Sequence, residues 1–117
     1  MNEEPLNFPQ QNLVQLLEYA AKVDAGAVLI LEDYAENEVE IASLQISKTG
    51  KGLGSKIMQN LIYQADRYGI NLMLIPAGMG LRRERLIEFY KRFGFQEDGD
   101  LMRYRAKPVV QKVALIP

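Results

Sequence analysis

Apolar residues recur every three to four positions in three stretches of the chain, which is the spacing of a helix with one buried face. The first stretch predicts a helix over residues 11–23. The second predicts a helix over residues 52–68 that ends at Gly69, because glycine adopts the left-handed conformation that closes a helix. The third predicts a helix over residues 81–92, and its apolar stripe contains Leu86, Phe89, Tyr90 and Phe93.

Short apolar runs lie between these helices and predict strands. Residues 27–31 and 39–46 flank a polar turn at residues 34–38, so they predict a β-hairpin. Residues 70–75 form an apolar run of the kind found in a strand buried on both faces. Further short strands are predicted over residues 95–97, 101–106 and 109–116.

The predicted elements follow the order helix, strand, strand, helix, strand, helix, strand, strand. A strand that returns to its sheet through a helix favours parallel pairing. We therefore predict the α/β (α+β) class, with a mixed, partly parallel sheet flanked by helices. The 117 residues are the size of one domain.

Composition removes several classes of chemistry. The chain has no histidine and no cysteine, which excludes Ser-His-Asp and Cys-His nucleophile systems, His-ligated metals and disulfides. Acid and base steps are left to Asp, Glu, Tyr and Lys, and we expect no metal. No stretch is long and apolar enough to span a bilayer, and the acidic start is unlike a signal peptide, so we expect a cytoplasmic protein without a membrane partner. The net charge of −1 argues against nucleic acid as a partner.

Three glycines lead the predicted strand over residues 39–46 into the helix that follows it, at Gly50, Gly52 and Gly54. Glycine lets backbone N–H groups approach an anion closely, and the N-terminus of a helix attracts negative charge. This turn therefore predicts a phosphate site. A Walker A loop needs Gly-Lys-Ser or Gly-Lys-Thr, an order that is absent here, so nucleotide hydrolysis is disfavoured.

Two motifs resemble the GCN5-related N-acetyltransferase (GNAT) family. Thr49-Gly50-Lys51-Gly52-Leu53-Gly54 is similar to the family's pattern at the turn from its fourth strand into its third helix, with Thr49 in place of Arg or Gln. Phe89-Tyr90-Lys91-Arg92-Phe93-Gly94-Phe95 is similar to the aromatic-Tyr-x-x-x-Gly-Phe segment that closes the family's fourth helix. The two motifs and the elements around them cover residues 39–106.

The resemblance implies a compact GNAT-like acyl-CoA N-acyltransferase fold with a shortened N-terminal part. Residues 1–38 would be a short acceptor-side segment, residues 39–106 the acetyl-CoA-binding core, and residues 107–117 a C-terminal strand or tail. The family normally places a strand, two helices and another strand ahead of the hairpin. Because only one helix and a leader stand there in this chain, a homodimer would let a second subunit complete the acceptor pocket.

The resemblance also implies a cofactor site. The family separates its fourth and fifth strands to admit the pantetheine arm of the cofactor, whose pyrophosphate lies at the glycine-rich turn. The implied acetyl-CoA-binding residues are Leu44, Gln45, Ile46, Thr49, Gly50, Lys51, Gly52, Leu53, Gly54 and Ser55.

Two residues are candidates for catalysis through the same resemblance. Residues 39–46 are similar to the fourth strand of the family's protein-lysine acetyltransferases, which carry a general-base Glu at the position of Glu40. An amine with a pKa of about 10.4 must lose a proton before it attacks a thioester. Tyr90 is the candidate acid for the leaving thiolate. The alternatives are a solvated strand residue for Glu40 and a core aromatic for Tyr90.

The function predicted is transfer of acetyl from acetyl-CoA to a primary amine by direct attack. The acceptor is either a small molecule, such as a polyamine or an amino sugar, or a protein lysine. The alternative is a non-catalytic CoA-binding or protein-interaction module that retains the fold. Arg82, Arg83 and Arg85 are candidates for contacts with CoA phosphates, with a solvated basic face as the alternative.

Overall fold

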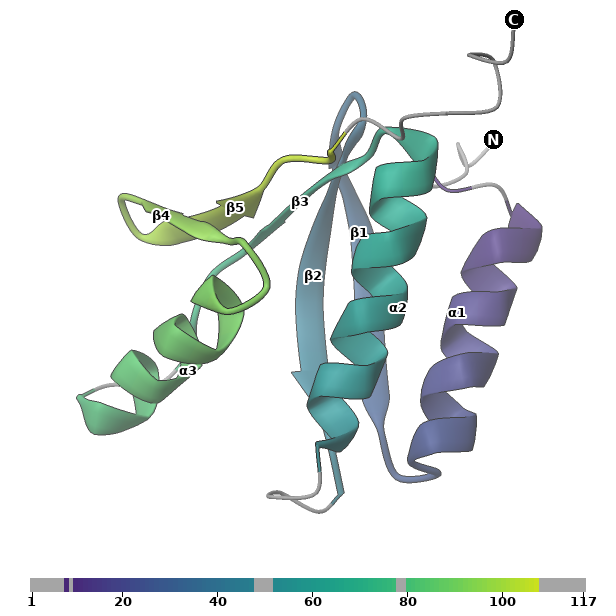
Figure 1. Ribbon diagram of the computed structural model, residues 1–117, viewed down its shortest axis with the longest axis horizontal. Helices are drawn as coiled ribbons and strands as arrows, with labels where there is room; N and C mark the ends of the chain where they lie inside the picture. The colour runs from purple at the N-terminus through teal and green to yellow at the C-terminus, as the bar shows by residue number, and fades with distance from the viewer. Residues whose placement is uncertain (1–7, 9, 48–51, 78–79, 108–117) are drawn as a thin grey trace, which may run out of the picture.

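The computed structural model describes residues 8, 10–47, 52–77 and 80–107 (Figure 1). The order of helices and strands is the predicted one, and the mixed α/β class is confirmed. The strand expected over residues 109–116 lies outside the described residues. The elements are α1 (Gln10–Val23), β1 (Val28–Ala35), β2 (Glu38–Gln45), α2 (Leu53–Tyr68), β3 (Asn71–Leu74), α3 (Leu81–Lys91), β4 (Gln96–Asp98) and β5 (Leu101–Tyr104).

The strands form one mixed sheet in the order β1-β2-β3-β5-β4. β2 and β3 are parallel, as expected for strands joined by the crossover helix α2, and the other neighbours are antiparallel. β1 extends to Ala35, so the predicted polar turn is shorter than expected. Its tip holds Asn37 at a φ of 57°, a left-handed conformation that asparagine tolerates in tight hairpins.

Both ends of α2 are set by glycines in the left-handed conformation. Gly52 precedes the helix at a φ of 70°, and Gly69 follows it at a φ of 66°. The Gly69 N–H donates to the carbonyls of Ala65 and Asp66, which closes the last turn. The predicted end of this helix at Gly69 is confirmed.

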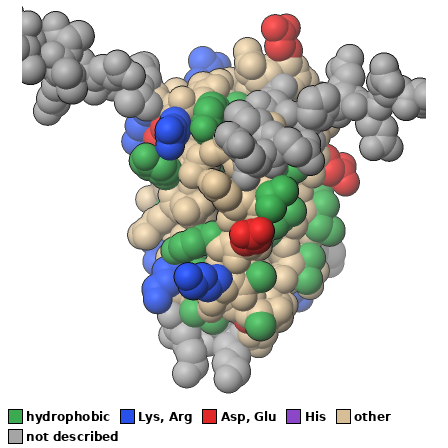
Figure 2. Space-filling view, turned by 90° about the vertical axis from the view of Figure 1, so that its right-hand side faces the viewer, with side chains coloured by type: hydrophobic (Ala, Val, Ile, Leu, Met, Phe, Trp, Pro, Cys, Tyr) green, Lys and Arg blue, Asp and Glu red, His purple; other side chains and the backbone are tan. Residues whose placement is uncertain are grey.

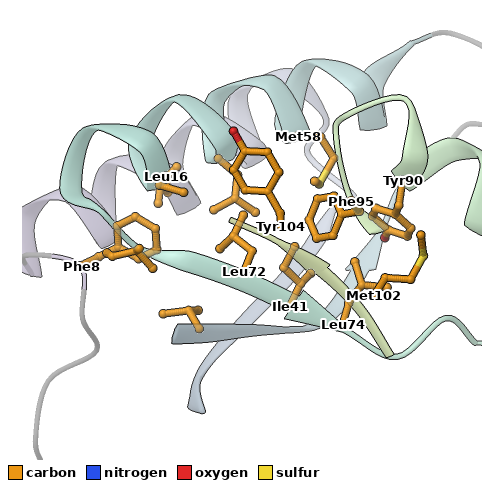
Figure 3. Close-up of a cluster of buried hydrophobic side chains, with 14 of the residues drawn as sticks. Phe8, Leu16, Ile41, Met58, Leu72, Leu74, Tyr90, Phe95, Met102 and Tyr104 are labelled. Atoms are coloured by element: carbon orange, nitrogen blue, oxygen red, sulfur yellow. The ribbon is translucent and has the colours of Figure 1, made fainter. Parts of the chain in front are cut away.

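The core lies between the helices and one face of the sheet (Figure 3). Val39, Leu72 and Tyr104 stand side by side across β2, β3 and β5 on this inner face, and each is at most 2% exposed. Buried side chains of all three helices pack on them, among them Leu16, Met58, Leu61, Ile87 and Tyr90. β3 is buried on both faces, as predicted, with Met73 on the outer face only 1% exposed.

The outer face of the sheet carries charged side chains and is more exposed than the inner face. Glu32, Glu40, Met73 and Arg103 stand in register across it, on β1, β2, β3 and β5. No described helix covers this face, because the buried side chains of all three helices pack on the inner one. Val28, Ile30 and Tyr34 of β1 are 40%, 45% and 50% exposed, respectively.

The surface around α1 shows no single large apolar area. Figure 2 views the side of the molecule on which α1 lies, and apolar side chains there alternate with acidic and basic ones. Val14 and Leu17 of α1 are 44% and 41% exposed. Apolar side chains scattered among charged ones are ordinary on a protein surface.

We expect Leu72→Ala to lower the free energy of unfolding by about 2–5 kcal/mol, because it leaves a cavity at a fully buried position in the centre of the sheet. Leu81→Ala is the matched control, since Leu81 is 69% exposed and its truncation should cost less than about 0.5 kcal/mol. Urea unfolding of both variants measures the difference. Equal losses would show that Leu72 is not part of the core that holds the fold.

Candidate functional site

The parallel pair β2 and β3 separates along its length. Three residue pairs join the strands, from Glu38 opposite Asn71 to Glu40 opposite Met73. β2 then continues to Gln45, and Figure 1 shows β3 turning away from it. Beyond Glu40, the side of β2 that faces β3 pairs with no strand among the described residues, so its outward backbone groups can accept another extended partner.

The predicted cofactor residues of β2 lie along and just beyond this unpaired part. Leu44 is half-buried, stands opposite Leu29 of β1 and packs against the core. Gln45 is exposed at the last position of the strand, and Ile46 follows it, half-buried. On the side that faces β1, Leu44 and Gln45 therefore pair with that strand. On the side that faces β3, they pair with no described strand.

The N-terminus of α2 lies next to the end of β2. Gly52 is its N-cap residue, and no side chain among the described residues caps the N–H groups of the first turn. A Cβ placed on Gly52 would meet no atom within 4 Å, so the backbone there borders open space. Leu53 and Ser55 are half-buried in the same turn. Thr49, Gly50 and Lys51, the other predicted members of the phosphate site, lie outside the described residues.

Gly54 brings the two sequence motifs together. A Cβ built on this buried glycine would lie 3.6 Å from Cζ of Phe89 and 3.7 Å from Cδ1 of Ile46. The first turn of α2 thus packs between the end of β2 and α3. The glycine-rich motif and the aromatic motif are far apart in the sequence but form one cluster.

Tyr90 belongs to this cluster from the α3 side. Its ring is 7% exposed and meets the rings of Phe89 and Phe95 edge-on, at centroid distances of 5.1 Å and 5.5 Å (Figure 3). Burial raises the pKa of Tyr90 above its usual value. The hydroxyl therefore keeps its proton at neutral pH, as a proton donor must.

Glu40 stands at the point where β2 and β3 separate. It is half-buried on the outer face, directly opposite Glu32 of β1, and its pair with Met73 is the last before the strands diverge. Tyr90 packs in the core on the inner face. The two candidate catalytic residues thus lie on opposite faces of the sheet, and one reactant can meet both only if it crosses the sheet where β2 and β3 no longer pair.

The three arginines of α3 are mostly exposed. Arg82 and Arg85 lie on the surface and Arg83 is half-buried. They belong to the first part of the helix, whereas Tyr90 belongs to its last turn. Their proposed contact with phosphates stays a prediction.

A shallow groove that the sequence did not predict lies on the helix side of the molecule. It has a volume of about 390 Å³ and is bordered by α2, the end of α3 and residues 104–107. Asp66 organises one wall, because its Oδ1 accepts hydrogen bonds from the Tyr104 hydroxyl at 2.7 Å and the Lys107 amide at 2.8 Å. Tyr90 and Glu40 are not among its lining residues.

The described residues contain neither a cluster of metal ligands nor a membrane-spanning helix. No group of three or more His, Cys, Asp or Glu side chains in that part of the chain is placed to hold a metal ion. None of the described helices has the length and apolar character needed to cross a bilayer.

Comparison with known proteins gives one structural similarity. No family model and no curated protein matches the chain. The structure is similar to the crystal structure of the anti-CRISPR protein AcrVA5, with a TM-score of 0.57 and 26% sequence identity. The similarity covers 68% of this chain and 90% of the AcrVA5 chain.

Two of the six tyrosines should resist ionisation in the folded protein. Burial raises the pKa of Tyr90, and burial together with the hydrogen bond to Asp66 raises that of Tyr104. A raised pKa means that the folded state keeps its proton longer, so the associated stability is complete below about pH 10 and is lost as the pH rises further.

An alkaline titration followed by tyrosinate absorbance should therefore show a late step that coincides with unfolding. Tyr90→Phe and Tyr104→Phe should each reduce that step by one group. Tyr63→Phe, at a position that is 60% exposed, is the control and should leave it unchanged. Ionisation of all six tyrosines before the chain unfolds would contradict the burial of these two hydroxyls.

Proposed function

We propose that this protein is an N-acetyltransferase that moves the acetyl group of acetyl-CoA to a primary amine. The observation that carries the proposal is the separation of the parallel pair β2 and β3 directly after Glu40, together with the N-terminus of α2 next to the end of β2, where no described side chain caps the helix. One extended molecule with an anionic end fits both features. The resemblance of the two sequence motifs to the GNAT family agrees with this assignment.

The cofactor would use the two features at its two ends. Its pyrophosphate would bind the N–H groups of the glycine-rich turn and of the first turn of α2, where the helix dipole favours negative charge. Its pantetheine arm would lie along the unpaired side of β2, with amide hydrogen bonds to residues 44–46. The contact of Gly54 with Ile46 and Phe89 keeps these two parts of the site adjacent.

Tyr90 would act as the acid. When the amine nitrogen attacks the carbonyl carbon, the C–S bond breaks and the electron pair leaves on sulfur. A thiol has a pKa of about 8.5, so a neutral hydroxyl beside the sulfur assists its departure by donating a proton. Tyr90 is held protonated by burial, and solvent would return its proton after each turnover.

Glu40 would act as the base, directly or through a water molecule. Its position opposite Glu32 places two carboxylates side by side on the outer face, an arrangement that like charges disfavour. Arg103, a cation on the same face, is paired with Glu38 and Asp98. A protonated amine is therefore attracted to the Glu32 and Glu40 pair before it transfers its proton and attacks.

Calorimetric titration with acetyl-CoA and desulfo-CoA, followed by thiol release across a panel of amines, tests the function. We expect Tyr90→Phe to keep the affinity for acetyl-CoA and to lower kcat by about 10²–10⁴-fold, the range for loss of a general acid. Tyr63→Phe on the exposed face of α2 is the matched control and should leave both constants unchanged. Absence of CoA binding by the unmodified protein would refute the proposal.

The acceptor side has its own test in Glu40→Gln and Glu32→Gln. Glu40→Gln removes the base and should lower kcat. Glu32→Gln removes only attraction to the amine and should raise KM for the amine by about two- to fivefold at low salt, the effect of one exposed charge pair. Glu36→Gln, at the tip of the hairpin, is the charge-matched control. An effect of Glu36→Gln equal to that of Glu32→Gln would contradict a local role for the carboxylate pair.

The similarity to AcrVA5 favours a second candidate function. AcrVA5 is an anti-CRISPR protein, and the similarity covers nearly all of its chain. This protein would then act against a CRISPR system, either through acetyl transfer or as a module that only binds a protein. An interference assay with the unmodified protein and Tyr90→Phe separates the two modes, because a binding module keeps its inhibition when the hydroxyl is removed.

A further inference from the structure

Arg103 of β5 is held on the outer face by contacts with three other strands. Its Nη1 forms an ion pair with Oε2 of Glu38 on β2 at 2.5 Å, and its Nε donates to Oδ2 of Asp98 on β4 at 2.8 Å. Its Cζ lies over the ring of Tyr34 on β1, 6.0 Å from the ring centre. Since β3 lies between β2 and β5, the Arg103 side chain passes over β3 to reach Glu38.

Glu40 stands in the same row of the sheet as Arg103. Met73 of β3 pairs with Glu40 on one side and with Arg103 on the other. Glu38 precedes Glu40 by two positions on β2, so both carboxylates belong to the outer face. A side chain that reaches Glu38 diagonally across β3 is long enough to reach Glu40 directly. Even so, no described residue forms an ion pair with Glu40.

The surroundings of the guanidinium explain why it lies at Glu38. The Glu38 side chain is only 16% exposed, and an ion pair that is partly shielded from water is stronger than one on the open surface. Tyr34 lies at the same end of the hairpin, because its neighbour Ala35 pairs with Glu38. Arg103 therefore has two carboxylates and an aromatic ring as partners in this position.

We propose that Glu38 is a positioning residue for the candidate base: it binds Arg103 and thereby keeps this cation from pairing with Glu40. The inference rests on the proposed function. An ion pair with Arg103 would occupy the carboxylate that accepts the proton of the amine. It would also cancel part of the charge by which Glu32 and Glu40 attract that amine. The pair of Glu38 with Arg103 thus preserves the negative charge on which the acceptor side depends.

Glu38→Gln tests this role directly, because it removes the charge that binds Arg103 and keeps the size of the side chain. In a crystal structure of the variant we expect a guanidinium nitrogen of Arg103 within about 4 Å of a carboxylate oxygen of Glu40. This measurement needs neither acetyl-CoA nor turnover. An Arg103 side chain that stays at position 38, or that turns to solvent, would contradict the proposal.

Thiol release with a cationic alkylamine measures the consequence for the reaction. Glu38→Gln should lower kcat/KM by about fivefold at low salt, the effect of one ion pair near the surface. Part of the loss should fall on kcat, because the base is occupied, and part on KM for the amine. An arylamine, which is neutral at neutral pH and attacks without losing a proton first, should keep its kcat/KM.

A second substitution separates this role from a merely structural one. Adding Arg103→Gln to Glu38→Gln removes the competing cation and should return kcat/KM for the alkylamine to within about twofold of the original. If Glu38 only stabilised the sheet, the second substitution would add to the loss instead. Thermal melting of each variant shows that the fold is retained under the conditions of the assay.

Glu97→Gln is the matched control. Glu97 of β4 also pairs with a cation, Lys91 of α3 at 3.1 Å, and its variant should leave kcat and KM unchanged. A loss in Glu97→Gln equal to that in Glu38→Gln, or no recovery on adding Arg103→Gln, would overturn the role of Glu38. Absence of thiol release by the unmodified protein with every amine would refute the proposed function. The crystal structure of Glu38→Gln would still decide whether Glu38 holds Arg103 away from Glu40.

Discussion

The parallel pairing of β2 with β3, and its end after Glu40, is the constraint on which the candidate site depends. Val39 and Leu72 hold the two strands together at one end, where both are fully buried under the helices. At the other end, β3 stops at Leu74 and the chain reaches Pro76, which has no N–H to give to a ladder. Among the described residues, β2 and β3 are therefore paired on one side of Glu40 and unpaired on the other.

The sequence alone was enough to predict the elements whose apolar residues recur at regular helical spacing or whose end is marked by a glycine. The long helices carry apolar residues at every third or fourth position, and Gly69 ends α2 where glycine was expected to. β1 was predicted too short, because Glu32, Asp33 and Tyr34 were assigned to polar sequence and turn. These residues lie in an edge strand with an exposed face, where polar side chains are compatible with strand structure.

The candidate site was predictable only where its residues are close in sequence. The two motifs named the residues around Gly54 and Tyr90, but not that Phe89 would touch the first turn of α2. Placement of Glu40 and Tyr90 on opposite faces likewise follows from the fold, which sets which way each strand residue points.

The described helices pack on only one face of the sheet, so the proposed donor and acceptor would approach from different faces. The described helices pack on the inner face, so the first turn of α2 and the Tyr90 side chain belong to that side. No described helix covers the outer face, and there Arg103 pairs with Glu38 and Asp98 while Glu32 and Glu40 face each other. A donor bound along β2 would thus place its thioester where β2 and β3 separate, near the face on which Glu32 and Glu40 would attract a cationic amine. Separation of the acid from the base by the sheet keeps Tyr90 in an apolar environment, which favours the protonated hydroxyl that a proton donor requires.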